Sequence, residues 1–531
     1  KRKPSATVKE SDPTTMCPLP HLTRRPTLII TQLAASAIIA CLPSHASEET
    51  PPNIVLLMGD DHGWEETGYN GHPHLQTPAL DAMASSGLRM DHFYSGHPSC
   101  SPTRGSVLTG RHPNRYGTFY PGCSLRPEEI TVAQLLNKAG YATAHFGKWH
   151  VGPVKTGSPT NPGAMGFDEW LSHDNFFEMN PMLSRNGGPP KKFPGEGSEI
   201  IIDETIQFIN KTAKTGKPFF TVVWFGSPHE PYSGLDKDLA LYDDLPEEYA
   251  DKMVALTSNE TGKRIKRPLR EVLRERFAEI TAMDRAIGKL RTHLKDQGLR
   301  DNTIVWYCGD NGIPPSGLAE SRFRALKGHV YEGGTRVPGV LEWPARITKP
   351  RITAVNAVTS DMLPTLCGIA GIPFPDRPLD GIDLGPVFDG TMTTRPKPIC
   401  FWNFRGARRP GQKPEPYIDP ELQKGTTPLV KLMGGIPTRN FVNHRYTEVQ
   451  EDDFRGPRVI LDNELKLVVD GSKGSGIELF DLRKDPGEKN NHLESNPEAA
   501  NDLQARLRTW QESVLHSLQG KDYLVTQPSR R

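Results

Sequence analysis

The short segment at residues 100–104, with the sequence Cys-Ser-Pro-Thr-Arg, holds the residue types that most directly indicate chemistry. A strand-like alternation precedes it, Ser99 can cap a helix, and Pro102 falls in the first turn. Gly110 is a typical helix end. Cys100 is therefore expected at the N-terminus of a short helix, where a negatively charged group is favoured. Taken alone, a cysteine is more commonly a buried structural residue. The surrounding residues must therefore decide between a structural and a functional role for Cys100.

Two long apolar runs end in polar side chains. Asp60 and Asp61 follow the run at residues 53–58, and Asp310 and Asn311 follow a similar run that ends at Cys308. Such runs predict strands buried on both faces of a mostly parallel sheet, whose carboxyl ends face ligands. An isolated Asp-Asp pair is more often a solvated turn. Four oxygen ligands at one edge would suit Ca²⁺ or Mg²⁺ rather than zinc.

Basic and imidazole side chains follow other predicted elements. Lys148 and His150 come after a strand, His229 comes after the apolar run at residues 218–225, and Lys327 lies in a Gly-rich segment. Histidine can hold a proton near neutral pH, and lysine can pair with an anion as a point charge. A single histidine in a loop is more often a surface residue. The places of Lys148, His150 and His229 after predicted strands favour a functional role for them.

From Pro52 to about Gly390 the chain resembles the formylglycine-dependent sulfatases of the alkaline-phosphatase superfamily, and in particular the arylsulfatase A and N-acetylgalactosamine-6-sulfatase branch. Four motifs carry the resemblance, at residues 53–64, 100–104, 147–152 and 324–338. The resemblance implies an α/β fold with a large, mostly parallel β-sheet flanked by helices. A smaller antiparallel sheet with a covering helix is expected near the C-terminus.

The resemblance also implies residue roles. Cys100 would be oxidised to Cα-formylglycine, whose hydrated aldehyde is the nucleophile, by a formylglycine-generating enzyme or an anaerobic sulfatase-maturating enzyme. One calcium ion would complete the site. Thr103 stands where many members have Ser, which leaves the activity in place. The implied catalytic residues are Cys100, Arg104, Lys148, His150, His229 and Lys327, and the implied metal ligands are Asp60, Asp61, Cys100, Asp310 and Asn311.

The implied reaction is hydrolysis of sulfate monoesters on sulfated sugars or polysaccharides, with N-acetylgalactosamine-6-sulfate-like esters as the first candidate. Two alternatives stay open. One is a phosphate or phosphonate ester hydrolase of the same superfamily, which kinetics on aryl sulfate and aryl phosphate would distinguish. The other is a catalytically silent protein that binds sulfated glycans, which would bind without releasing sulfate.

Composition and length limit the remaining possibilities. The 531 residues carry a net charge of +1, which argues against nucleic acid as the main partner. The 49 glycines and 49 prolines indicate a loop-rich enzyme rather than a helical bundle. We expect a leader at residues 1–46, a catalytic domain at 50–390 and a smaller subdomain at 391–531. That subdomain is predicted to contain a hairpin within residues 465–482 and a final helix at 499–518.

The leader has the pattern of a secretory signal peptide, with two arginines before the apolar run at residues 27–40 and a small-residue cleavage site ending at Ala46. The protein is therefore expected to be exported, periplasmic or secreted, with no transmembrane span in its mature form. Met16 is an alternative start, and Cys41 loosely fits a lipidation site. Disulfides are permitted among Cys123, Cys308, Cys367 and Cys400, but their pairing stays open.

Three further segments carry weaker signals. The loop at residues 161–197 contains His173, Asp174 and Asn175, which could touch a sugar or belong to a plain surface loop. Residues 239–267 are polar with scattered charges and are expected to be exposed. Glu332 is expected to serve packing within its turn.

Overall fold

The apolar runs form the centre of a ten-stranded sheet in the computed structural model, which describes residues 51–523 except 178, 259–260, 262, 405–414, 429–439 and 472–475. Strands β1 (Asn53–Gly59), β4 (Ala142–Lys148), β8 (Phe219–Trp224) and β11 (Thr303–Gly309) lie in the order β11-β1-β8-β4 and are parallel. Their carboxyl ends therefore share one edge. The outer strands are β2 (Leu88–Met90), β5 (Glu169–His173), β6 (Met182–Arg185), β7 (Lys191–Lys192), β12 (Gly339–Glu342) and β13 (Arg351–Thr353).

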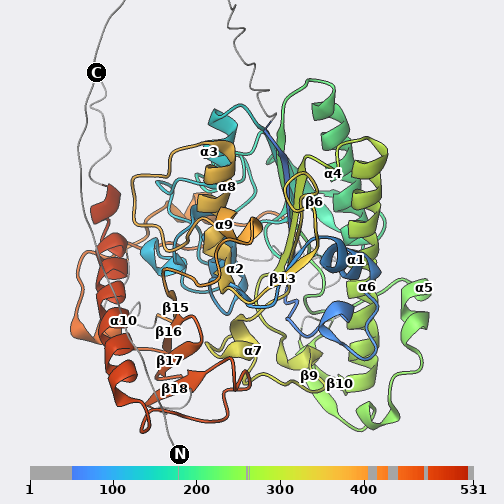
Figure 1. Cartoon of the computed structure of the whole chain (residues 1–531). Coiled ribbons are helices and arrows are strands. Elements are labelled where there is room, and N and C mark those ends of the chain that lie inside the picture. Colours follow the sequence, from blue (N-terminus) through green and yellow to red (C-terminus); the bar gives the residue numbers. More distant parts are fainter. Residues whose placement is uncertain are drawn as a thin grey trace, which may run out of the picture. The chain divides into compact units, whose positions relative to one another are not determined.

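Helices cover both faces of this sheet (Figure 1). One face packs on α3 (Val132–Lys138), α8 (Met362–Ala370) and α9 (Gly385–Phe388), and the other on α1 (Pro78–Ser86), α4 (Gly197–Ala213) and α6 (Leu269–Asp296). Alternate residues of β1 point to opposite faces, so Ile54 and Leu56 join one core while Val55 and Leu57 join the other. The continuous apolar run in β1 follows from this double burial, and the predicted α/β fold is confirmed.

The helix that carries Cys100 begins where the sequence predicts. Helix α2 (Cys100–Thr109) follows an extended Ser99, whose side chain makes no capping hydrogen bond, and it ends at Gly110 with a left-handed φ of 68°. The preceding segment differs from the prediction of one strand. It forms β2 in the large sheet and then β3 (Phe93–Tyr94), which pairs with β14 (Ala357–Val358) in a separate small sheet.

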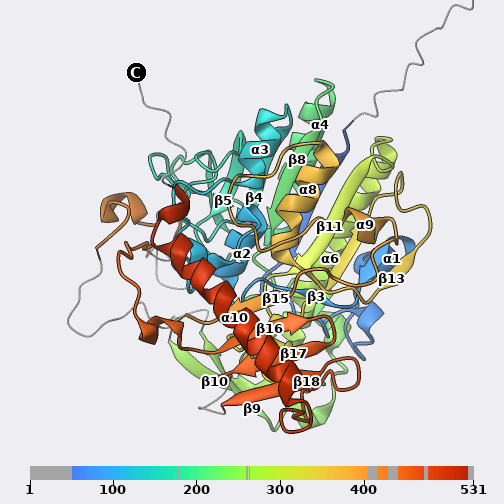
Figure 2. The same ribbon diagram turned by 60° about the vertical axis from the view of Figure 1, so that its left-hand side comes forward.

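A four-stranded antiparallel sheet and a long helix follow, as predicted. The strands are β15 (Ile399–Trp402), β16 (Arg458–Asp462), β17 (Leu465–Val469) and β18 (Ile477–Asp481). Helix α10 (Pro497–Leu518) crosses this sheet (Figure 2) and packs Leu503 and Leu507 on its strands. Pro51–Arg531 forms one unit by its internal contacts, and the domain boundary at residue 391 stays a prediction.

Residues 239–267 are mostly exposed, as predicted, and they contain two strands that the sequence analysis did not assign. Strands β9 (Met253–Thr257) and β10 (Arg264–Pro268) form an antiparallel hairpin that pairs with no other strand among the described residues. Leu256, which is 2% exposed, packs with Val272 and so attaches the hairpin to α6. Its many charges concealed the strand alternation in the sequence.

The predictions for the leader, including Met16 and Cys41, fall on residues outside those that the structure describes. Within the described part of the chain, no helix combines the length and the apolar character that a membrane crossing requires.

Candidate active site

Polar residues from four central strands and one helix meet at the shared carboxyl edge of the sheet. Asp60 and Asp61 follow β1, His229 follows β8, and Asp310 follows β11. Lys148 is the last residue of β4 itself, rather than a residue of the loop after it. Cys100 is the first residue of α2. The structure thus brings together residues that lie up to about half the chain apart.

Cys100 is buried, and its Sγ lies 3.8 Å from Oδ1 of Asp61. Burial, together with the negative charge of Asp310, raises the pKa of the Cys100 thiol well above its usual value. A thiolate is the nucleophilic form of cysteine, and this environment disfavours it even at the N-terminus of a helix. The unmodified thiol is therefore poorly suited to attack.

Each of the three carboxylates contacts a basic side chain. Lys148 Nζ donates to Asp60 Oδ2 at 2.6 Å, and Arg104 donates to Asp310 Oδ2 at 2.7 Å. Arg104 and Lys148 are fully buried. Their positive charges neutralise the carboxylates, which matters because an unpaired charge is costly in the protein interior. Burial and the neighbouring Asp60 nevertheless raise the pKa of Asp310 to about 6.

Asp61 has the most basic surroundings. Lys327 Nζ lies 2.5 Å from its Oδ1 and 2.6 Å from its Oδ2, and Asn311 Nδ2 donates to Oδ1 at 2.9 Å. Burial alone would raise the pKa of Asp61, but Lys327, His229 and Lys148 hold it well below its usual value. Asp61 is therefore ionised at neutral pH and available as a ligand.

The ligand atoms fit a hard cation. One atom each from Asp60, Asp61, Cys100 and His229 all lie within 4.8 Å of one another. Among the described residues, Asp60 Oδ1 and Asn311 Oδ1 are buried and accept no hydrogen bond. Buried oxygens of this kind are ordinarily satisfied, so a cation bound at them would supply the missing interaction. His229, predicted as a catalytic residue, also lies within reach of such an ion.

The two predicted histidines have different surroundings. His150 has a left-handed φ of 59° and lies beside Phe441, with 6.3 Å between the ring centroids. His229 donates from Nδ1 to the carbonyl of Glu230 at 2.5 Å, and its Nε2 lies 3.7 Å from Asp61. Burial lowers the pKa of His229 to about 3. Its ring stacks on Phe176 at 4.7 Å.

Solvent reaches the site at His229 and Lys327. Their side chains are 17% and 21% exposed, whereas those of Asp60, Lys148 and Arg104 are fully buried. An ester group would therefore enter beside His229 and Lys327 and meet Cys100 and Lys148 deeper in the site.

Arg276 is a supporting residue that sequence reasoning missed. It is fully buried in α6, donates to the backbone carbonyl of Asp61 at 2.6 Å, and forms an ion pair with Glu66 at 2.6 Å. Asp61 has a left-handed φ of 64°, and this contact holds its carbonyl in that conformation. The available signal was an arginine within the apolar stripe of α6, between Val272 and Phe277.

The segment that carries Lys327 is attached to the C-terminal sheet at both ends. Arg324 forms an ion pair with Glu478 of β18 at 2.9 Å. Lys466 of β17 lies 2.9 Å from Glu332 and 2.8 Å from Glu488, and all three side chains are fully buried or nearly so. Glu332 is therefore a member of a buried ionic cluster, which corrects its expected role in turn packing.

The segment at residues 173–175 has mainly structural contacts. Asp174 is fully buried and accepts hydrogen bonds from the backbone amides of Val154, Thr426 and Thr427. His173 contacts the carbonyl of Pro428 at 3.4 Å. These side chains tie distant loops together, so the plain structural interpretation fits them better than sugar contact.

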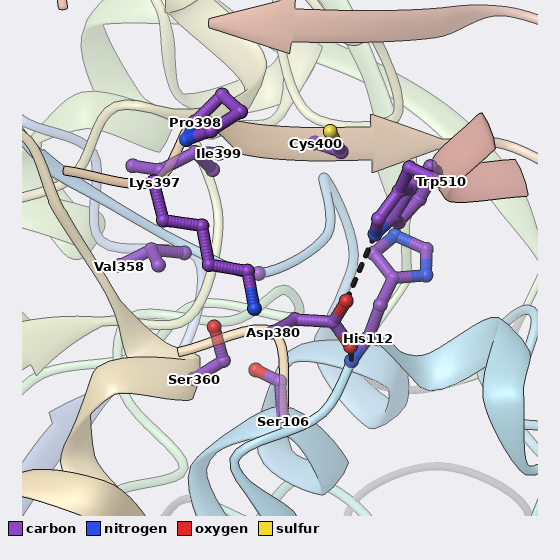
Figure 3. A pocket seen from close by; sticks show the side chains of 11 residues that line it. Ser106, His112, Val358, Ser360, Asp380, Lys397, Pro398, Ile399, Cys400 and Trp510 are labelled. Carbon is purple, nitrogen blue, oxygen red and sulfur yellow. Dashed lines mark hydrogen bonds between the residues drawn. The ribbon is translucent and has the colours of Figure 1, made fainter. Parts of the chain in front are cut away.

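Among the described residues, Cys100, Cys308, Cys367 and Cys400 form no disulfide. One small cavity is lined by none of the residues of this site. The cavity, of about 20 Å³, lies between Asp380, His112 and Trp510 (Figure 3), and Trp510 donates to Asp380 at 2.8 Å. This volume suits about one water molecule and is too small for a sugar.

Comparison with known proteins agrees with this geometry. Residues 52–372 match the family model described as Sulfatase. The chain is 30% identical over 423 residues to an ulvan-active sulfatase of Formosa agariphila, covering 78% of this chain and 76% of that protein.

Two human proteins are similarly related. Arylsulfatase A is 31% identical over 392 residues, covering 70% of this chain and 74% of its own length. N-acetylgalactosamine-6-sulfatase is 32% identical over 386 residues, covering 65% of this chain and 67% of its own length. The crystal structure of Ps i-CgsB in complex with k-i-k-neocarrahexaose has a TM-score of 0.69 at 22% identity, covers 90% of this chain and 98% of its own, and shares the fold.

Proposed function

The chain belongs to the sulfatase family and is a sulfuric ester hydrolase, and we propose that it removes sulfate from sulfated sugars through a formylglycine formed at Cys100. The observation that carries the proposal is the position of Cys100 at the N-terminus of α2, 3.8 Å from Asp61, with Lys148 and Lys327 bound to the adjacent carboxylates. This arrangement suits an anionic ester and disfavours a plain thiolate.

Asp60, Asp61, Asp310 and Asn311 would hold one calcium ion, which would supply positive charge beside a sulfate oxygen when bound. The oxygen-rich set and the two buried oxygens without hydrogen bonds support this assignment. No cluster of histidines suited to zinc accompanies these residues in the described part of the chain, so a hard cation is the better fit.

Converted to Cα-formylglycine, Cys100 would supply a hydrated aldehyde whose two hydroxyls serve attack on sulfur and release of sulfate. Arg104, Lys148 and Lys327 would neutralise charge on the ester oxygens, because positioned cations stabilise the charge that builds up in the transition state. Lys327 would protonate the leaving alcohol, or His229 would do so if the anionic ester raises its pKa from about 3. His150 would accept a proton from the second hydroxyl, so that sulfate can leave and the aldehyde return.

The substrate proposed first is a sulfated sugar with an N-acetylgalactosamine-6-sulfate-like ester. Its support is the similarity to N-acetylgalactosamine-6-sulfatase at 32% identity. We further propose that the protein is exported, that a maturing enzyme modifies Cys100, and that residues 391–531 form a subdomain. These three proposals rest on sequence patterns.

The test is a paired measurement on protein produced together with a formylglycine-generating enzyme. Mass spectrometry of the tryptic peptide covering residues 90–104 would report an aldehyde at residue 100. The same preparation would then be assayed for sulfate release from aryl sulfate and from N-acetylgalactosamine 6-sulfate, with aryl phosphate as the comparison. An aldehyde with faster phosphate than sulfate release would favour the phosphohydrolase alternative. An aldehyde with binding but no sulfate release would favour the silent glycan-binding alternative.

A further inference from the structure

The β9–β10 hairpin has an outward face with two cations that no acidic side chain on the facing strand covers. Arg264 and Lys266 are two residues apart on β10, so their side chains point to the same side. The residues directly opposite them on β9 are Thr257 and Ala255. The other side of the hairpin carries Leu256, which is buried toward α6. The cationic side therefore faces solvent.

This face lies next to the entrance of the active site. Arg264 donates to Oε1 of Glu230 at 2.7 Å, and Thr257 donates to the same oxygen at 3.3 Å. Glu230 directly follows His229, and its Oε2 accepts a hydrogen bond from Ser316 at 3.1 Å. The hairpin is thereby fixed to the loop that carries His229, one of the two partly exposed residues of the site.

The two cations differ in their partners. Arg264 is 59% exposed and already bound to Glu230. Lys266 is exposed and has no ion-pair partner among the described residues. Two residues of a strand span about 7 Å, so Lys266 lies about one sugar-sized step along β10 from Arg264. Met253 is 55% exposed on the same side and adds an apolar surface.

We propose that the outward face of the β9–β10 hairpin binds a second anionic group of the substrate, a sulfate or carboxylate on a sugar next to the one that is desulfated. The inference rests on the proposed function, because it extends the same site. It assigns the substrate class as polyanionic oligosaccharides or polysaccharides rather than singly sulfated small molecules. Charge complementarity selects this occupant, since an exposed lysine without an acidic partner beside an anion-accepting site favours a further anion.

The test compares two charge reversals. Lys266→Glu changes the hairpin, and Lys217→Glu is the control, because Lys217 is also exposed but precedes β8 and so lies at the opposite end of the strand that leads to His229. Both variants change the net charge equally. Each is assayed on a chondroitin 6-sulfate tetrasaccharide and on aryl sulfate.

For Lys266→Glu we expect the ratio of kcat/KM on the tetrasaccharide to kcat/KM on aryl sulfate to fall about five- to tenfold, as reversal of an exposed charge contact allows. The control leaves the ratio unchanged. The wild-type ratio should also fall with added salt, and the ratio of the variant should depend less on the salt concentration. An unchanged ratio in Lys266→Glu would overturn the proposal.

A binding measurement separates this inference from the proposed function. Titration calorimetry with the tetrasaccharide is made in the Cys100→Ala background, with and without each reversal. If wild-type protein with a verified aldehyde cleaves neither substrate, the proposed function fails. Weaker binding caused by Lys266→Glu but not by Lys217→Glu would still support the hairpin surface, and equal binding by both would contradict it.

Discussion

The ammonium of Lys327 lies 2.5 Å and 2.6 Å from the two carboxylate oxygens of Asp61, although 266 residues separate them in the chain. Asp61 is almost fully buried, while the Lys327 side chain is 21% exposed and marks the open side of the site. One lysine thus touches both the proposed ion-binding carboxylate and the space where an ester would enter. This double contact makes Lys327 the residue most able to link binding of the cation with binding of the ester.

Replacement of Lys327 by methionine keeps most of the length of the side chain and removes its charge. We expect kcat/KM for aryl sulfate to fall about 10²–10³-fold, because one positioned charge at the reacting group is lost. Lys327→Arg should recover part of this loss if the charge alone matters. An aryl sulfate with a better leaving group should reduce the defect if Lys327 donates the proton, and a constant defect would limit its role to charge.

Cys100→Ser tests the role of the aldehyde while keeping one hydroxyl at residue 100. Serine can form a sulfate ester but has no second hydroxyl to release it, so we expect no steady turnover. A peptide sulfated at residue 100 should accumulate in this variant, which mass spectrometry of the tryptic fragment would show. Steady turnover by Cys100→Ser at the wild-type rate would contradict the proposed chemistry.

Removal of divalent cations should lower both activity and stability. A ligand that binds only the folded protein stabilises it, so added calcium should raise the Tm of chelator-treated protein. Asn311→Leu removes one oxygen at nearly constant volume and should weaken that calcium-dependent rise. Differential scanning fluorimetry with calcium, magnesium and zinc measures this directly. A Tm that no cation changes would contradict the metal assignment.

The sequence predicted the site where the signals were local. The apolar run of β1 leads directly into Asp60 and Asp61, so both strand and ligands are visible in one stretch. Contacts between residues far apart in the chain could not be predicted from the sequence. Arg276 supports Asp61 from 215 residues away, and Lys466 binds Glu332 from 134 residues away. Such pairs depend on tertiary packing, which no spacing rule within one segment encodes.

Lys466 should be essential for stability, since it is a single buried cation between Glu332 and Glu488. Lys466→Met leaves two buried carboxylates without their shared partner. Breaking a buried ionic cluster in this way costs about 3–5 kcal/mol, so we expect a large fall in the free energy of unfolding. The double variant Lys466→Met with Glu488→Gln should be less destabilised, and denaturant unfolding compares the two. Equal losses in the two variants would show that the unpaired charge of Glu488 does not cause the destabilisation.

The same cluster should make stability depend on pH. Burial, with the neighbouring charge of Glu332, raises the pKa of Glu488 from its ordinary 4.5 to about 7. Between these values the folded protein retains a proton that the unfolded chain has lost, so the stabilising contribution is complete below pH 4.5 and is lost as the pH rises through 7.

Glu488→Gln removes this titration, so the free energy of unfolding of the wild type relative to that of the variant should fall by about 2–3 kcal/mol between pH 5 and pH 8. Urea unfolding at a series of pH values measures both proteins. Glu478→Gln is a suitable comparison, because Glu478 belongs to the neighbouring contact with Arg324. A difference between wild type and Glu488→Gln that is constant across this pH range would mean that Glu488 is already ionised in the folded protein, held so by Lys466.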